Sequence, residues 1–269
     1  MKLASFYKML SEIAKENGYN LSRVLDNVFE LKKGNKKLYF RGRNFGLNSA
    51  LSSQLCSNKG QTYAVLKRNN LPVVPHFGIY NPETYNFFGD QKKRNEKREN
   101  AVIKREGWPL VIKPAEGSSG IGVELVSRKR DLKKLLKTLF IRNDEVVLSP
   151  FRVIEHEYRV IVLSGKVELI FDKIRTSDDF RHNLCLGAKS KVLTEKDKNY
   201  QKLEALAKRA TKALKLEFSS VDIVETADLG LEILEVNSSV SLSYFGGQSK
   251  ENYQIAKNIY KKAFKKATK

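Results

Sequence analysis

Residues 108–123 read Trp-Pro-Leu-Val-Ile-Lys-Pro-Ala-Glu-Gly-Ser-Ser-Gly-Ile-Gly-Val, a strand, a lysine and a loop of small residues in succession. The apolar run Pro109–Ile112 predicts a buried strand that delivers Lys113 at its end. The small residues of Gly117–Gly122 let the backbone approach an anion and point successive N–H groups at it. Lysine adds a point charge for phosphate oxygens. The stretch therefore predicts a phosphate-binding site, with a plain glycine-rich hairpin as the alternative.

Two common nucleotide motifs do not describe this loop. No Gly-Lys-Ser/Thr ends it, so it is not a Walker A loop. A strand is expected at 122–127, whereas a dinucleotide fingerprint opens a helix and spaces its glycines differently.

A second stretch combines acidic and amide side chains on two neighbouring strands. Asp222 lies in the otherwise apolar run 219–224, and Glu235 and Asn237 lie two residues apart in 231–237. Residues two apart on a strand face the same way, and a hairpin through 228–230 would bring Asp222 beside them. Two carboxylates and an amide oxygen suit Mg²⁺ that also bridges phosphates. The alternative is three exposed polar residues, but unpaired polar groups among apolar neighbours are costly.

Two further segments carry residues of interest. Arg159 lies among β-branched residues of a predicted strand, where a fixed guanidinium could face phosphate or form a structural salt bridge. The polar segment 178–188 contains Arg181 and His182, and composition alone fits a substrate loop and a surface loop equally well.

Hydrophobic periodicity along the whole chain predicts an α+β fold, because antiparallel hairpins alternate with amphipathic helices. Helices are expected at 4–17, 20–32, 59–70, from Pro82, at 129–140, 197–215 and 250–267. Strands are expected at 36–42, 76–80, 109–114, 122–127, 145–149, 157–164, 166–175, 219–225 and 230–236. Residues 89–107 contain seven Lys or Arg and four acids, and we expect a mobile helix or loop on the surface.

Composition sets limits on the class of protein. The chain has 269 residues, 41% of them hydrophobic, which suits a globular protein with its own core. Cys56 and Cys185 fit no zinc, redox or disulfide spacing, and no apolar run reaches the length of a membrane span. We therefore expect a soluble, cytoplasmic protein with reduced thiols. The net charge of +20 attracts anions without choosing among them, and most of it is expected to be solvated surface.

Together these stretches form an ordered series that resembles the ATP-grasp superfamily, in its carboxylate–amine ligase branch. The likeness covers roughly residues 50–245 and is greatest to ribosomal-protein glutamate ligases and to the ATP-grasp parts of cyanophycin synthetases and bifunctional glutathione synthetases. The pieces that carry it are Ser57-Asn-Lys59 followed by Leu71-Pro-Val-Val-Pro75, the stretch 108–123, Glu157-Tyr-Arg-Val-Ile-Val162, Asp179-Phe-Arg-His-Asn183, Val221-Asp-Ile-Val-Glu225 and Glu235-Val-Asn-Ser-Ser239.

The resemblance implies a role for each matching residue. Lys59 and Lys113 would bind the α- and β-phosphates of ATP, and the loop from Gly117 would close over the phosphates. Asp222, Glu235 and Asn237 would hold Mg²⁺, with Mn²⁺ as an alternative. Arg159, Arg181 and Asn183 would act at the reacting phosphate. The further nucleotide contacts implied are Glu116, Ser118, Ser119, Gly120, Ile121, Gly122, Val147 and Leu148.

The resemblance also implies an architecture of two α+β lobes with antiparallel sheets around a nucleotide cleft. We expect a reduced N-terminal segment at 1–55, a small lobe at 56–145 with a basic insertion at 89–107, and a large lobe with the metal site at 146–269. The chain departs from the family pattern at three places. Ser149-Pro150 replaces the usual hinge acid, Val240-Ser241 replaces Pro-Gly, and Gly187-Ala188 replaces Gly-Gly. The last two lie where an acceptor would bind, so the acceptor stays open.

The expected activity is ATP-dependent ligation of a carboxylate to an amine through an acyl phosphate, with release of ADP and phosphate. An amino acid or peptide is the expected substrate, and an acidic protein or peptide tail would suit the basic surface. The rival hypotheses are an ATP-grasp phosphotransferase and a non-catalytic basic module that binds nucleic acid or protein. Nucleic-acid binding is disfavoured because no set of stacking aromatic residues and no reader motif accompanies the basic run. No membrane partner is expected, and a homo-oligomer is left open.

Overall fold

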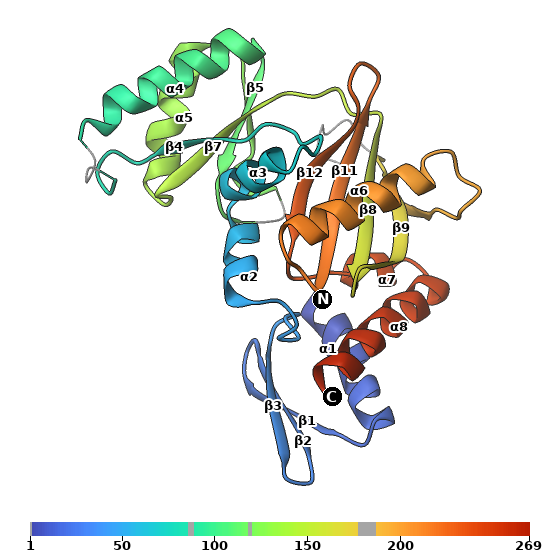
Figure 1. The fold of residues 1–269 in the computed structure, drawn as a ribbon. Helices are drawn as coiled ribbons and strands as arrows, with labels where there is room; N and C mark the ends of the chain where they lie inside the picture. Colours follow the sequence, from blue (N-terminus) through green and yellow to red (C-terminus); the bar gives the residue numbers. More distant parts are fainter. Residues whose placement is uncertain (1, 86–88, 118–119, 177–186) are drawn as a thin grey trace.

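The computed structural model describes residues 2–85, 89–117, 120–176 and 187–269. Three antiparallel sheets with packed helices make up this part of the chain, so the predicted α+β class is confirmed. In Figure 1 the small lobe lies at the upper left, a five-stranded sheet at the right, and a three-stranded sheet with the terminal helices below.

The large lobe is built on a five-stranded sheet in the order β10-β9-β8-β11-β12. α6 packs against one face of this sheet through an apolar core of leucines, valines and isoleucines. The elements are β8 His156–Leu163, β9 Lys166–Ile174, β10 Lys189–Val192, α6 Tyr200–Ala213, β11 Phe218–Thr226 and β12 Gly230–Asn237.

The opposite face of this sheet changes from apolar to charged along its strands. On β8, Ile161 and Leu163 belong to the core under the C-terminal helices. Glu157 and Arg159 point to the same face, because side chains alternate along a strand, but they line an open cleft. The charged half of the face is therefore the floor of the cleft, and the apolar half anchors it.

The small lobe is a four-stranded sheet, in the order β4-β7-β5-β6, covered by two helices. Leu132 and Leu136, four residues apart on α5, are buried against the sheet. The elements are α3 Lys59–Arg68, β4 Phe77–Tyr80, α4 Gln91–Glu106, β5 Leu110–Pro114, β6 Glu124–Val126, α5 Lys129–Phe140 and β7 Glu145–Pro150.

The N-terminal segment forms a layer of its own with the C-terminal helix. An aromatic cluster that includes Phe6, Phe45, Tyr260 and Phe264 fills the space between α1, the three-stranded sheet and α8. The elements are α1 Lys2–Glu16, β1 Asn20–Leu25, β2 Val28–Lys33, β3 Lys36–Arg41, α2 Ala50–Ser57, α7 Ser243–Gly246 and α8 Lys250–Ala267. The N-terminal segment and the C-terminal helix thus share one hydrophobic core.

The linker between α3 and β4 is bonded to the edge of the large sheet. The backbone N–H of Val74 donates to the carbonyl of Ile233 at 2.9 Å, and the N–H of Ile233 donates to the carbonyl of Pro72 at 2.9 Å. Val73 and Ile233 form an isolated parallel bridge. The small lobe is therefore joined directly to β12, the strand that carries Glu235.

Two of the sequence predictions are wrong. Residues 20–32, predicted as a helix, form the β1–β2 hairpin, in which Phe29 and Leu31 alternate into the core. No helix starts at Pro82, where residues 82–84 form a turn and the next helix, α4, begins at Gln91.

The basic segment 89–107 contains a helix, which was one of the two expected alternatives. On this helix, α4, Gln91, Asn95, Glu99 and Val102 are buried at helical spacing. The helix packs on β4. α2, β10 and α7 were not predicted.

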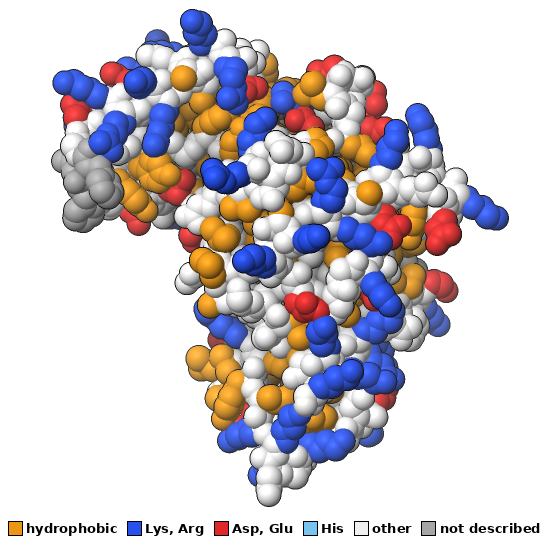
Figure 2. Space-filling model, in the orientation of Figure 1, with side chains coloured by type: hydrophobic (Ala, Val, Ile, Leu, Met, Phe, Trp, Pro, Cys, Tyr) orange, Lys and Arg blue, Asp and Glu red, His pale blue; other side chains and the backbone are white. Residues whose placement is uncertain are grey.

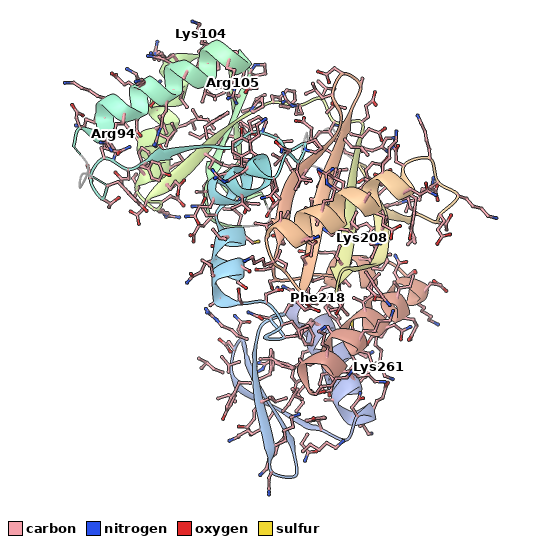
Figure 3. The ribbon with its side chains drawn as sticks, in the orientation of Figure 1. Arg94, Lys104, Arg105, Lys208, Phe218 and Lys261 are labelled. Carbon is pink, nitrogen blue, oxygen red and sulfur yellow. The ribbon has the colours of Figure 1, made fainter. Side chains whose placement is uncertain are left out.

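Positive charge is spread over the face of the molecule that is seen in Figure 2. Figure 2 shows Lys and Arg side chains scattered over all of the visible face. Lys104 of α4, Lys208 of α6 and Lys261 of α8 stand on three separate helices (Figure 3). No helix within the described ranges is long and apolar enough to cross a membrane.

Candidate active site

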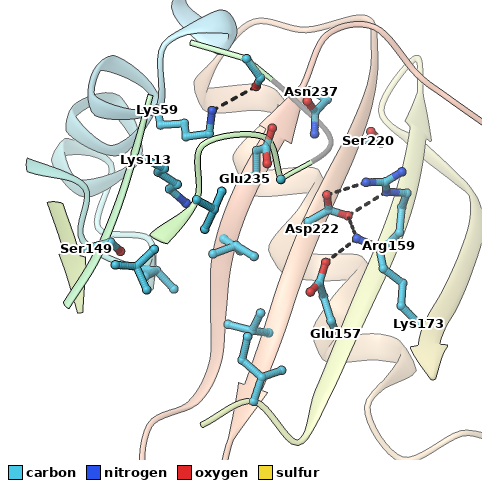
Figure 4. A pocket seen from close by; sticks show the side chains of 18 of the residues that line it. Lys59, Lys113, Ser149, Glu157, Arg159, Lys173, Ser220, Asp222, Glu235 and Asn237 are labelled. Carbon is cyan, nitrogen blue, oxygen red and sulfur yellow. Dashed lines mark hydrogen bonds and ion pairs between the residues drawn. The ribbon is translucent and has the colours of Figure 1, made fainter. Parts of the chain in front are cut away.

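A cleft of about 430 Å³ lies between the small lobe and the charged half of the large sheet. Lys59 and Lys113 reach towards it from α3 and β5, and Asp222 and Glu235 rise from β11 and β12 opposite (Figure 4). The predicted site residues that line the cleft are Lys59, Lys113, Glu116, Gly117, Gly120, Ile121, Arg159, Asp222, Glu235 and Asn237. Residues more than 170 positions apart, such as Lys59 and Glu235, therefore share one cavity.

Other predicted residues lie elsewhere. Val147 and Leu148 are buried within the small-lobe sheet and do not line the cleft, and neither does Gly122. The part of this chain segment that borders the cleft is Ser149–Arg152. Ser118, Ser119, Arg181 and Asn183 lie outside the described residues, so their roles stay predictions.

Lys59 supports the start of the glycine loop. Asn58 caps α3, because its side chain accepts a hydrogen bond from the N–H of Gln61 at 3.0 Å, and this fixes Lys59 as the first helical residue. The Nζ of Lys59 donates to the carbonyl of Gly117 at 3.1 Å, and its backbone N–H donates to the carbonyl of Ala115 at 3.0 Å. Lys59 thus ties the helix to the loop while its charge faces the cleft.

Lys113 is a half-buried cation at the end of β5. Burial lowers the pKa of its ammonium group to about 8, since water no longer solvates the charge. The negative charge of Glu235 opposes this shift, and the positive charge of Lys59 adds to it. A phosphate in the cleft would favour the charged form and restore its pKa towards the ordinary value.

Four charged side chains, Arg159, Asp222, Lys173 and Glu157, form a chain of ion pairs on the floor of the cleft. The Nε and Nη2 atoms of Arg159 donate to the two oxygens of Asp222 at 2.8 and 2.7 Å. The Nζ of Lys173 lies 3.0 Å from Asp222 and also pairs with Glu157. Burial alone would raise the pKa of Asp222, but Arg159 and Lys173 outweigh it and hold that pKa well below its usual range. The network is electrically balanced.

Glu235 and Asn237 stand apart from this network. Among the described residues neither side chain makes a hydrogen bond or an ion pair, although both line the cleft. Asp222 lies directly opposite Glu235 across the β11–β12 pair. No group of three or more His, Cys, Asp or Glu suited to a metal occurs in the described part of the chain. The oxygens of Asp222, Glu235 and Asn237 nevertheless fit a hard divalent cation, because Glu235 and Asn237 make no hydrogen bond or ion pair within the described ranges and so keep their oxygens available.

This arrangement has a counterpart among known families. The family model described as a RimK-like ATP-grasp domain matches residues 56–262. The chain belongs to the RimK-like ATP-grasp family. The resemblance inferred from the ordered sequence motifs is thereby confirmed.

Curated relatives of this ATP-grasp chain are named as ligases. A D-alanine–D-alanine ligase of Clostridium botulinum is 28% identical over 193 residues, 70% of this chain and 59% of that protein. A "Probable alpha-L-glutamate ligase" of Histophilus somni is 31% identical over 138 residues, 50% of this chain and 44% of that protein. The chain thus spans less than two thirds of the length of these relatives.

Solved structures support the ATP-grasp fold. The D-alanine–D-alanine ligase of Bacillus anthracis complexed with ATP has a TM-score of 0.60 at 20% identity, covering 82% of this chain and 67% of that one. A bifunctional glutathione synthetase of Pasteurella multocida has a TM-score of 0.57 at 17% identity, covering 96% of this chain and 44% of that one. The second match includes most of the N-terminal segment.

The ATP-grasp cleft also contains residues that the sequence analysis missed. Glu157 and Lys173 belong to the charged network, and Ser220 and Arg43 line the cleft further along. Glu157 and Arg159 are two residues apart in a strand, so period-two spacing would have placed them on one face. No sequence motif near Lys173 or Arg43 predicts a place in the site, because the packing of distant segments brings both residues there.

The pKa of Lys113 predicts a pH dependence of nucleotide binding. If the bound phosphates require a charged Lys113, ADP binding above about pH 8 must take up one proton, and affinity should fall by up to about tenfold per pH unit. Calorimetric titration of ADP without Mg²⁺, in buffers of different ionisation enthalpy, counts this proton. The charged or titratable groups around Lys113 are Lys59, Glu235, Glu157 and His76.

Two controls isolate Lys113 in this titration. The variant Lys113→Arg stays charged throughout, so its affinity should not fall between pH 8 and 9.5. Burial and the nearby Lys113 lower the pKa of His76 well below its usual value, so His76 is neutral across this range. Binding of ADP to the parent without proton uptake at pH 9 would rule out the assignment.

Proposed function

We propose that this chain is an ATP-dependent carboxylate–amine ligase. It activates a carboxylate by transfer of the γ-phosphoryl group of ATP and passes the acyl group to an amine, releasing ADP and phosphate. An amino acid or peptide is the proposed substrate class, consistent with the names of its relatives.

One observation carries this proposal. Two lysines of the small lobe and the oxygen ligands Asp222, Glu235 and Asn237 of the large lobe line the same cleft. A triphosphate carries several negative charges, and a polyanion can be reached by a carboxylate only where fixed cations offset the repulsion. The cleft supplies such cations from one side and oxygen ligands for a divalent ion from the other.

The two ends of the cleft differ in polarity, and this orients the nucleotide. Val74, Val111, Ile154, Val224 and Leu234 line one part of the cleft, next to Ser149–Arg152. An apolar slot with nearby backbone groups suits a flat base that needs both stacking and a few hydrogen bonds. We place adenine there, so that the phosphates run towards Lys113 and Lys59.

The residues that would hold Mg²⁺ are Asp222, Glu235 and Asn237. When bound, the ion would neutralise phosphate charge and favour transfer of the terminal phosphoryl group. Arg159 holds Asp222 in a bidentate pair, which fixes the direction of its carboxylate. Lys173 in turn pairs with Asp222 and with Glu157, which extends the network by one more ion pair.

The chemistry needs no covalent bond to the protein. A substrate carboxylate oxygen attacks the γ-phosphorus, the bond to ADP breaks, and an acyl phosphate forms. The amine then attacks the acyl carbon, the C–N bond forms, inorganic phosphate leaves, and the amine loses a proton to solvent. Lys113 and Arg159 stabilise negative charge in these steps, and the loop from Gly117 would keep water from the intermediate.

Trapping with hydroxylamine tests the proposal and separates it from its nearest rival. The twenty common L-amino acids and D-alanine are tested singly and in pairs with Mg²⁺ and ATP. For the active set, ADP release should be accompanied by a hydroxamate when hydroxylamine replaces the amine. Lys113→Met should abolish both products. ADP release with a phosphate ester and no hydroxamate would indicate a phosphotransferase instead.

A basic module that binds nucleic acid or protein without catalysis is the remaining rival. The dispersed charge in Figure 2 and the packing of α4 on β4 do not favour it. Salt-sensitive binding of nucleic acid that persists in Lys113→Met, with no ADP release by the parent, would support that reading.

A further inference from the structure

One end of the cleft carries polar residues that the ATP chemistry does not use. Beyond Asn237 the lining continues through Ser239, Ser241 and Tyr244, and it includes Arg43 from the loop after β3. Ser241 belongs to the pair Val240-Ser241, at which the chain departs from the family pattern, and Ser239 directly precedes that pair. The residues that bind the acceptor must therefore be inferred from this structure and not from the family pattern.

Arg43 lies at the end of the cleft that is opposite to the apolar slot. Along β11, Val224, Asp222 and Ser220 point to one face in that order, so Ser220 marks the far end. The side chain of Asn48 donates to the carbonyls of Phe218 at 2.7 Å and Ser238 at 3.0 Å. These hydrogen bonds hold the loop between β3 and α2, which contains Arg43 and Asn48, against the end of the cleft that Ser220 marks.

Within the described part of the chain, the guanidinium of Arg43 has no anionic partner. Among the described residues it makes no hydrogen bond or ion pair, and its buried Nε is without an acceptor. The guanidinium lies over the ring of Phe6, with its carbon 5.9 Å from the ring centroid. A buried donor without an acceptor is costly, so it calls for an explanation, and a ligand in the cleft that accepts this hydrogen bond would provide one.

The acidic side chains that line the cleft do not pair with the guanidinium of Arg43. Glu116, Glu157, Asp222 and Glu235 line the cleft, and Glu157 and Asp222 are already paired with Lys173 and Arg159. A planar guanidinium binds a carboxylate through two parallel hydrogen bonds, and hydroxyl groups such as those of Ser239 and Ser241 can add further donors. The chemistry at this end is thus that of a carboxylate site.

We propose that Arg43 binds the carboxylate of the acceptor, so that the acceptor is an amino acid or a peptide and not a simple amine. The inference rests on the proposed ligase function, because the amine of the same molecule must reach the acyl phosphate formed near Arg159. The acceptor carboxylate is not consumed in the reaction. The N-terminal layer therefore contributes a specificity residue to a site that the two lobes otherwise build.

The first test uses the active set found with the twenty L-amino acids and D-alanine. In Arg43→Gln the KM for the acceptor should rise about 10- to 100-fold while the KM for ATP stays unchanged. The parent should discriminate against the acceptor amide, which lacks the negative charge, and Arg43→Gln should not. Arg43→Lys should recover part of the loss. Arg41→Gln is the matched control, since Arg41 is exposed on β3 and does not line the cleft.

The second test needs no turnover. Phenylglyoxal modifies arginine side chains, and peptide mapping by mass spectrometry follows the modification of Arg43 with each of the same amino acids present. An amino acid that binds here should slow modification of Arg43, while its amide should not. Thermal unfolding of each variant confirms that it is folded.

The combined outcomes separate the two proposals. ADP release by the parent with unchanged kinetics in Arg43→Gln would overturn the carboxylate site and leave the ligase standing. Protection of Arg43 by an amino acid without any ADP release would support the carboxylate site and overturn the ligase. If no amino acid protects Arg43, the carboxylate site is wrong.

Discussion

Replacing Glu235 with glutamine is expected to abolish most of the Mg²⁺ dependence of nucleotide binding and to lower ADP release at least about a hundredfold. Glutamine keeps the size of the side chain but removes its negative charge. Because Glu235 has no hydrogen bond or ion pair among the described residues, the folded structure should lose little. The attraction between Glu235 and Lys113 is lost, so we expect the free energy of unfolding to fall by about 1 kcal/mol, the typical cost of a single substitution.

Calorimetric titration with ADP, with and without Mg²⁺, measures the first effect, and denaturant unfolding measures the second. Glu204→Gln is the matched control, because it removes a carboxylate from the surface of α6 and away from the cleft. If Glu235→Gln binds ADP with the Mg²⁺ dependence of the parent, Glu235 is not a metal ligand.

Replacing Asp222 with asparagine should have a different signature, namely a large loss of stability. The change leaves the buried Lys173 and the partly buried Arg159 with Glu157 as the remaining acid in the network. Removing one partner of a buried ion pair costs about 3–5 kcal/mol, because an uncompensated charge remains out of water. We expect a decrease of that size in the free energy of unfolding, together with loss of ADP release.

Guanidinium unfolding of single and double variants checks this prediction. The double variant Asp222→Asn with Lys173→Met leaves Glu157 opposite Arg159 and should recover part of the lost stability. Glu204→Gln breaks the exposed pair with Lys208 and should cost about 0.5 kcal/mol or less. A loss below about 1 kcal/mol in Asp222→Asn would show that the network is not buried in solution.

The parts of the site that could be predicted are those encoded locally. Glu235 and Asn237 share a face because strands have a period of two, and a short hairpin brings Asp222 opposite Glu235. Lys113 and the glycine loop are adjacent in sequence. In each case the residues that come together in the site are also close in sequence. Their arrangement could therefore be predicted without knowing how distant segments pack.

The wrong helix at 20–32 and the missed site residues lie where the local sequence pattern fits two structures or predicts none. Leu21, Val24, Leu25 and Val28 match helical spacing, but the chain turns at residues 26–27 and the apolar side chains of β2 alternate instead. Three-dimensional packing places Lys173 beside Asp222 and the loop of Arg43 beside Ser238. No short window contains such a contact.

The bonds of Ile233 to Pro72 and Val74 have a consequence for how the cleft would close. Since the small lobe is fixed to β12 two residues before Glu235, this attachment would serve as the pivot of any rotation between the lobes. A rotation about it would carry Lys59 and Lys113 through an arc while Glu235 and Asn237 stayed almost stationary. The lysines could then release ADP while the oxygen ligands kept their positions, so the proposed metal site would not have to form again before the next turnover.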